Sequence, residues 1–342
     1  MPQLEENLTY ILLAFLSLAL LTSFRSPVIK AEDPVLFIPL NFYVAEVQDQ
    51  RDIKGPEAMG LNNFIATNLP KNLSRKPIII DIKELSVKET PGKTGLVEGE
   101  IKISLSFSLK KETYHQHLLN YTGGMRYSRL ATNKTIIDQH LKNLHKSALL
   151  YFNKWMNTNI ATSKVLASGV KVHFKYYEEE LEGDTIYYTA SRPLTWSDFK
   201  SKIRRSNKYA AMVMPNIGYD QNEEITDGVI HVTITLKTFL AKTDCWLGSS
   251  YKDSYMLNHE QRHFDVAKIV TEQFNKQIAK AKLNTDNYEA VINMQYLDSY
   301  RDMNKLQKDY DAQTAHGLNR TAQDTWNKRI DDLLAGKTIP DA

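Results

Sequence analysis

The apolar residues of this chain follow two different periods, and the change from one to the other occurs twice. Apolar and polar side chains alternate over residues 100–109, as in a strand with one buried face. Over residues 133–155 the apolar side chains recur every three or four positions, which predicts an amphipathic helix that covers a sheet. Alternation returns over residues 228–240, and helical spacing follows beyond Gly248. We therefore expect an α+β protein with two successive units of sheet and helix.

Two domains also agree with the length of 342 residues, because a typical domain has about 150 residues. The first is expected over residues 32–160, and its sequence shows no catalytic group. The second is expected over residues 165–335, where a small sheet precedes three helices. The expected strands are residues 35–47, 78–82, 100–109, 170–177, 184–189, 210–214 and 228–240, and the expected helices are residues 133–155, 251–282, 288–311 and 321–334. The turn signals at residues 91–95 predict a hairpin, and the pair Gly123 and Gly124 is interpreted as a turn.

The N-terminus carries an uncharged apolar run over residues 8–24. As a helix this run would be about 25 Å long, slightly less than the apolar core of a bilayer. Residues 1–31 are therefore interpreted as a signal peptide or a membrane anchor. Both readings place the remainder of the chain outside the cytoplasm, and residues 8–24 provide a membrane tether if they are retained.

Charge and cysteine content exclude several classes of protein. The chain has 43 Lys and Arg against 40 Asp and Glu, a net charge of +3, so it lacks the strongly basic surface that nucleic-acid binding requires. The single cysteine, Cys245, cannot form an intramolecular disulfide or a thiolate zinc site. Any metal ion must therefore be bound by histidine and carboxylate side chains.

The sharpest motif is His259-Glu260-Gln261-Arg262-His263, a match to HExxH in the first long helix of the second domain. Residues four apart lie on one helical face, so His259 and His263 can bind the same Zn²⁺ ion. Glu260 lies beside them, where a general base can take a proton from water. The alternative is a solvated helix face on which Glu260 pairs with Arg262 or Lys268.

A catalytic zinc ion needs a third protein ligand. Asp265 and Glu272 turn away from the two histidines on a straight helix, so the ligand should come from another segment. We expect His316, at the end of the next helix, with Asp311 or Thr314 holding its imidazole in place.

Two further residues enter this interpretation of the site. His231, on the strand that precedes the motif helix, is the reserve candidate for the third ligand. Tyr310 is expected either to donate a hydrogen bond to a developing oxyanion or to pack in the core.

Three segments of the second domain resemble the bacterial domain of unknown function 922. They are Leu257–Val266 (LNHEQRHFDV), Tyr310–Gly317 (YDAQTAHG) and Gln323–Trp326 (QDTW), in that order. The resemblance covers about residues 165–335 and implies a zincin-like fold and a secreted zinc-dependent protease. The chain differs from the family pattern at Lys268, where the family commonly has an acidic residue.

The expected function is hydrolysis of peptide bonds in a peptide or protein substrate, with Zn²⁺ bound by His259, His263 and His316 and with Glu260 as the general base. Residues 228–240 are considered as a strand that aligns an extended substrate. Two alternatives stay open. One is a non-catalytic envelope binding protein with a structural or vestigial metal site, and the other is a zinc hydrolase that acts on a non-peptide amide.

Overall fold

The computed structural model describes residues 41–51, 57–177, 183–203, 209–248 and 252–337. The chain divides into two compact units, Met1–Tyr151 and Phe152–Ala342. The apolar run at residues 8–24 and the first part of the strand expected at 35–47 lie outside the described residues. Among the residues that are described, no helix is long and apolar enough to cross a membrane.

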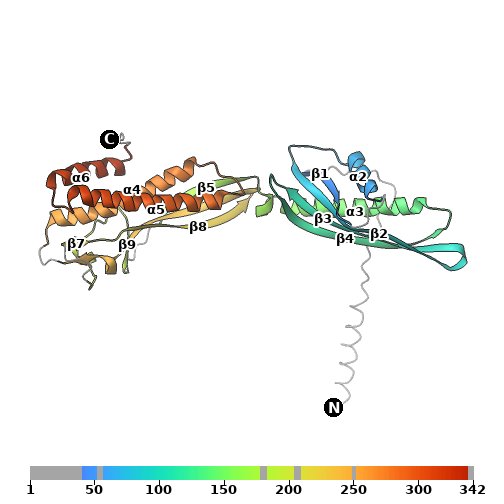
Figure 1. Cartoon of the computed structure of the whole chain (residues 1–342), viewed down its shortest axis with the longest axis horizontal. Coiled ribbons are helices and arrows are strands. Elements are labelled where there is room, and N and C mark those ends of the chain that lie inside the picture. The colour runs from blue at the N-terminus through green and yellow to red at the C-terminus, as the bar shows by residue number, and fades with distance from the viewer. Residues whose placement is uncertain (1–40, 52–56, 178–182, 204–208, 249–251, 338–342) are drawn as a thin grey trace, which may run out of the picture. The chain divides into compact units, whose positions relative to one another are not determined.

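The first unit contains a four-stranded sheet with the order β1-β2-β3-β4 (Figure 1). Its strands are β1 (Phe42–Asp49), β2 (Lys76–Pro91), β3 (Leu96–Lys110) and β4 (His115–Leu130), with helix α2 (Glu57–Asn68) between the first two. β1 is parallel to β2, because α2 carries the chain back to the same end of the sheet. The other neighbours are antiparallel, and the predicted hairpin joins β2 to β3.

Helix α3 (Thr135–Asn159) follows the sheet, and the boundary between the two units falls within it. In the first unit its Tyr151 contacts Tyr121 of β4, with ring centroids 5.6 Å apart. The helix and the alternating strand β3 are both present where the sequence predicts them.

The interpretation of Gly123 and Gly124 as a turn is wrong, because both lie inside β4 and pair with Ile103 and Lys102 of β3. A Cβ on Gly124 would lie 2.9 Å from the carbonyl oxygen of Ile101. Glycine is thus used here for close contact between backbones within the sheet.

The second unit has strands first and helices afterwards, as expected. Its elements are β5 (Gly169–Tyr176), β6 (Thr185–Tyr187), β7 (Ala211–Met212), β8 (Asn216–Thr226), β9 (Val229–Ala241), β10 (Trp246–Leu247), α4 (Ser254–Lys280), α5 (Tyr288–Thr314) and α6 (Arg320–Leu334). β9 is the central strand: it is parallel to β5 and antiparallel to both β6 and β8. β7 and β10 form a separate antiparallel pair.

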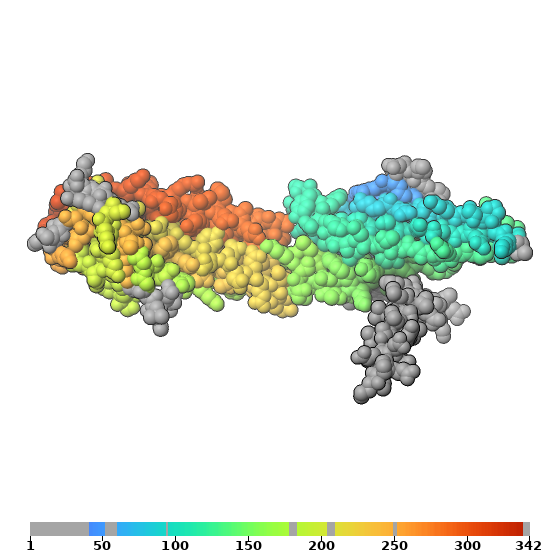
Figure 2. All heavy atoms as spheres, turned by 90° about the horizontal axis from the view of Figure 1, so that it is seen from below, coloured from blue at the N-terminus to red at the C-terminus, as the bar shows by residue number. Residues whose placement is uncertain are grey.

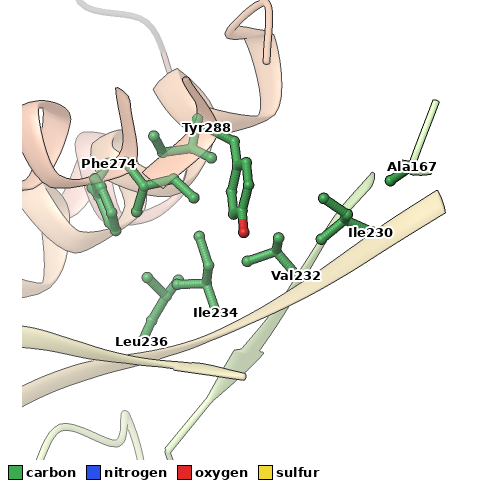
Figure 3. Packing of buried hydrophobic residues seen from close by; sticks show 9 residues of the cluster. Ala167, Ile230, Val232, Ile234, Leu236, Phe274 and Tyr288 are labelled. Carbon is green, nitrogen blue, oxygen red and sulfur yellow. The ribbon is translucent and has the colours of Figure 1, made fainter. Parts of the chain in front are cut away.

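The core of this unit lies between β9 and the helices. Figure 3 shows Ile230, Val232, Ile234 and Leu236 pointing from β9 toward Phe274 of α4 and Tyr288 of α5. In Figure 2 the yellow atoms of residues 210–241 lie directly against the orange and red atoms of the helices. This packing holds α4, the helix that carries the HExxH motif, against one face of the sheet.

Candidate metal centre

The two histidines of the motif lie one turn apart on the buried side of α4. Asp253 caps this helix by accepting a hydrogen bond of 2.6 Å from the backbone N–H of Met256. The ring centroids of His259 and His263 are 5.0 Å apart, and only 6% and 9% of these residues is exposed. Their burial contradicts the alternative of a solvated helix face.

A third donor atom comes from α5. Oδ1 of Asp311 lies 3.0 Å from Nε2 of His263 and 3.3 Å from Nε2 of His259. In a tetrahedral zinc site with bonds of about 2.0 Å, ligand atoms are about 3.3 Å apart. Within the described ranges, these three residues are the one group of His, Cys, Asp or Glu side chains whose ligand atoms all lie within 4.8 Å of one another. The group could hold a metal ion.

His316 lies next to this group but outside it. Its Nδ1 is 3.4 Å from Oδ1 of Asp311, its side chain is 44% exposed, and its ring is 4.3 Å from the ring of Tyr209. Thr314 does not hold the imidazole of His316, because its hydroxyl donates to the carbonyl oxygen of Tyr310 at 2.8 Å. The structure thus puts Asp311 where the sequence predicts His316, and a ligand role for His316 stays a prediction.

Two glutamines hold the imidazole rings in place. Oε1 of Gln323 accepts from Nδ1 of His259 at 2.9 Å, and Oε1 of Gln307 accepts from Nδ1 of His263. The amide of Gln307 also donates to the carbonyl oxygen of His263 at 2.9 Å. Because an amide oxygen only accepts, Nδ1 carries the proton in each neutral ring, and the lone pair on Nε2 faces Asp311.

The environment of Asp311 indicates that a cation belongs there. Its Oδ1 is buried and, when the rings of His259 and His263 are neutral, accepts no hydrogen bond from any described residue, although their Nε2 atoms lie 3.3 and 3.0 Å away. Burial alone would raise the pKa of this carboxyl, but hydrogen bonds and charge from the imidazoles of His259 and His263 in their protonated form lower it overall, so the group is a carboxylate. When the rings are neutral, two nitrogen lone pairs and one carboxylate oxygen converge with no proton between them. The residues present therefore fit a divalent metal ion.

A proton competes with the metal ion at His263. Burial opposes a charge on its ring, but Asp311 and Glu260 raise the pKa of His263 overall. Metal binding to this set should therefore release a proton.

Glu260 points into the same region from α4. It is 4% exposed, and its Oε2 accepts a hydrogen bond of 3.0 Å from the backbone N–H of Val213, directly after β7. Burial is the main reason that the pKa of Glu260 is raised. A carboxyl with a raised pKa is suited to accept a proton near neutral pH.

Tyr310 is completely buried and turned away from the cavity. Its hydroxyl donates to the carbonyl oxygen of His259 at 3.2 Å and accepts from the amide of Gln323 at 2.6 Å. Its ring stacks on the ring of His259 at 4.8 Å, and burial raises its pKa. In this position Tyr310 orients His259, and we assign it no contact with an oxyanion.

The turn after α5 is unusual in its backbone conformation. Ala315, His316 and Gly317 have φ values of 49°, 54° and 81° in succession. Left-handed conformations are costly for residues other than glycine, and they persist where surrounding contacts require them. Tyr255 supplies such a contact, because its hydroxyl donates to the carbonyl oxygen of Gly317 at 2.6 Å.

A cavity of about 690 Å³ opens onto these groups. One wall is the extended segment 209–216, and the others come from α4, α5 and the turn that follows α5. His259, Glu260, His263, Asp311 and His316 all line it. The cavity is large enough for a ligand of several residues.

Other candidates from the sequence lie away from the cavity. His231 is on the face of β9 opposite the helices, where its Nδ1 is 3.0 Å from Nε2 of His173. Lys268 pairs with Glu272 at 2.7 Å and does not line the cavity. β9 cannot align a substrate through backbone pairing, because strands occupy both of its edges.

Sequence reasoning missed Asp311 as a donor and Gln307 and Gln323 as partners of the histidines. A signal for one of them was present, since Gln323 begins the QDTW segment. Gln307 and Asp311 are four residues apart on α5, which places both on one helical face.

Fold and centre together define an α+β protein in which one helix carries two histidines and a glutamate and a neighbouring helix supplies a carboxylate. The resemblance found in the sequence is confirmed: the family model described as "Bacterial protein of unknown function (DUF922)" matches residues 229–317. The matched region runs from β9 to the glycine of the turn after α5 and contains all three donor residues.

Other comparisons add little. No curated protein matches the chain. A crystal structure of a minor lipoprotein from Acinetobacter baumannii is similar, with 11% sequence identity, a TM-score of 0.23, and coverage of 35% of this chain and 95% of that chain. Because that score is low, we infer nothing about this chain from that protein.

Proposed function

We propose that this protein is a zinc-dependent peptidase that acts outside the cytoplasm, with a zincin-like centre formed by His259, His263, Asp311 and Glu260. One observation carries the proposal. Two imidazole Nε2 atoms and a buried carboxylate oxygen without a hydrogen bond converge within 4.8 Å, beside a buried glutamate that lines the same cavity.

The donor set favours zinc over harder cations. Two imidazoles and one carboxylate are ligands that catalytic zinc sites use, whereas Mg²⁺ and Ca²⁺ prefer oxygen alone. Three protein ligands leave a fourth position open. When bound, a zinc ion supplies a Lewis acid that lowers the pKa of water to about 7 and polarises a carbonyl group.

Glu260 handles the proton in this proposal. Its Oε2 is occupied by the N–H of Val213, so we assign proton transfer to Oε1. Glu260 accepts a proton from water during attack on the peptide carbonyl and then delivers it to the nitrogen of the leaving amine.

The other residues of the site keep the histidines in position. Gln323 and Gln307 hold the Nδ1 protons, and Tyr310 stacks on His259. His316 lines the cavity and is partly exposed, so its imidazole is available to the substrate or as a further ligand. The extended segment 209–216 lines the cavity, and a peptide in extended form would lie along it.

The variant Glu260→Gln tests the proposal. We expect it to retain zinc, because Glu260 is not one of the ligands, and to lose about 10³-fold or more in kcat/KM on peptide substrates, because an amide cannot accept the proton. Glu272→Gln is the matched control on the same helix, since Glu272 pairs with Lys268 away from the cavity.

The same assay separates the alternatives. A wild-type protein that binds zinc and hydrolyses no peptide would contradict the peptidase proposal and favour either a binding protein or a hydrolase of non-peptide amides. Those two are told apart by adding amide-crosslinked cell-wall fragments to the substrate panel.

A further inference from the structure

Among the described residues that line the cavity, Arg320 is the only lysine or arginine. It is the first residue of α6, directly after Asn319, which caps that helix by accepting from the N–H of Ala322 at 3.1 Å. Its side chain therefore brings a permanent positive charge to the rim of the candidate centre.

The position of this charge is set by Tyr255. The guanidinium carbon of Arg320 lies 4.2 Å from the centroid of the Tyr255 ring, and the hydroxyl of Tyr255 is tied to the carbonyl oxygen of Gly317 at 2.6 Å. Tyr255 precedes His259 by four residues, so both side chains lie on the same face of α4, about 6 Å apart along its axis. Arg320 is thus held beside the centre on the His259 side.

The guanidinium of Arg320 forms no ion pair with a described carboxylate, although Asp324 and Asp253 act electrostatically on Tyr255 beside it. By contrast, Arg262 contacts Asp265 at 2.9 Å and Arg192 contacts Asp198 at 2.7 Å. A guanidinium held over an aromatic ring keeps its N–H donors at its edge, where they match the two oxygens of a carboxylate.

The acidic groups of the cavity do not use this charge. Asp311 is engaged with the imidazoles, and Glu260 accepts from the N–H of Val213. A ligand that carries its own carboxylate would therefore be complementary to the open positive charge at Arg320.

We propose that Arg320 binds a carboxylate of the substrate, so that the enzyme prefers peptides with a negative charge close to the cleaved bond. This inference rests on the proposed peptidase function. Tyr255 and His259 are about 6 Å apart along α4, and an extended peptide advances about 3.3 Å per residue, so the charge is expected a few residues from the bond. The carboxylate is either the free C-terminus of a peptide or the side chain of Asp or Glu.

Cleavage of a peptide mixture tests the proposal. The mixture consists of synthetic peptides with randomised positions, each made with a free carboxyl C-terminus and with an amide C-terminus. The zinc-loaded full chain is incubated with it, and the products are sequenced by mass spectrometry. Cleavage that is confined to the free-carboxyl set identifies the C-terminal carboxylate as the group that Arg320 binds. Enrichment of Asp and Glu near the cleaved bond in both sets identifies a side-chain carboxylate instead.

The variants give the proposal its control. Arg320→Gln should reduce the preference for carboxylate-bearing peptides by roughly 10- to 100-fold, the effect of losing a charge-assisted hydrogen bond. Arg320→Glu should shift the enrichment toward Lys and Arg. Arg329→Gln should keep the preference, because Arg329 lies over Trp326 on the same helix but does not line the cavity.

Each contrary result has a distinct meaning. If the wild type shows no preference for carboxylate-bearing peptides, or if Arg320→Gln keeps that preference, the carboxylate proposal is wrong while the peptidase function stands. If the wild type cleaves no peptide at all, the proposed function fails and this inference fails with it.

Discussion

A Cβ atom on Gly317 would lie 3.3 Å from Cγ of His259, so the glycine after α5 is packed against a ring of the candidate centre. Gly317 also has a φ of 81°, a conformation that favours glycine. Two separate constraints, space and backbone conformation, therefore act on this one residue.

Gly317→Ala should weaken zinc binding as well as stability. The added methyl group forces the ring of His259 to move by a few tenths of an ångström, and we expect zinc affinity to fall at least about tenfold. The free energy of unfolding should fall by about 2 kcal/mol. Zinc titration with a competing chelator and urea unfolding measure the two effects.

Gly336→Ala is the matched control for this change. Gly336 has a similar φ of 76°, but a Cβ there would meet no described atom within 4 Å. It should cost about 1 kcal/mol of stability and leave zinc affinity unchanged. Equal zinc affinities in the two variants would show that contact with His259 is unimportant.

Gln323→Ala should lower zinc affinity by about 10- to 100-fold without removing a ligand, because the Nδ1 proton of His259 loses its acceptor. Gln313→Ala serves as the comparison, since Gln313 accepts from the indole of Trp326 and does not touch either histidine. A Gln323→Ala protein with wild-type affinity would mean that contacts other than the one with Gln323 fix the orientation of His259.

Stability of the first unit should fall in mild acid because of His145. This residue of α3 is 1% exposed, both of its ring nitrogens lack a partner among the described residues, and burial lowers its pKa to about 4. The unfolded chain binds a proton near pH 6.5 and the folded chain near pH 4. The free energy of unfolding is therefore not reduced by His145 above about pH 6.5, and it falls by about 3 kcal/mol as the pH falls to about 4.

His145→Leu should remove this pH dependence, and His115→Leu, at an exposed position of β4, should keep it. Urea unfolding followed by circular dichroism between about pH 4 and pH 7 compares the variants. If the free energy of unfolding depends on pH equally in His145→Leu and in the wild type, the acid sensitivity comes from other groups.

The parts of the fold that the sequence predicted well are those with a regular period. Helices α4, α5 and α6 and strands β3 and β9 lie close to their expected positions because one face of each is buried. β8 was missed because Gln221 and Glu223 interrupt its apolar alternation. Lys164 and the hydroxyl of Tyr288 donate hydrogen bonds to that carboxylate, at 2.9 Å and 2.8 Å.

The site was predictable only as far as local helix geometry determines it. His259, Glu260 and His263 are related by the turns of a single helix, so their spacing indicates their arrangement. The third donor depends on how α5 packs on α4 and on the left-handed turn after α5. That turn leaves His316 partly exposed, while the packing of α5 on α4 places Asp311 beside both imidazoles, and neither result follows from residue spacing.

The most direct test is the zinc content of the purified protein after zinc loading and dialysis, with Asp311→Asn and His316→Ala beside the wild type. We expect about one zinc ion per chain in the wild type and in His316→Ala, and almost none in Asp311→Asn, which loses the carboxylate that faces both imidazoles. A wild type that stays free of metal, or an Asp311→Asn protein that retains its zinc while His316→Ala loses it, would contradict the centre described above.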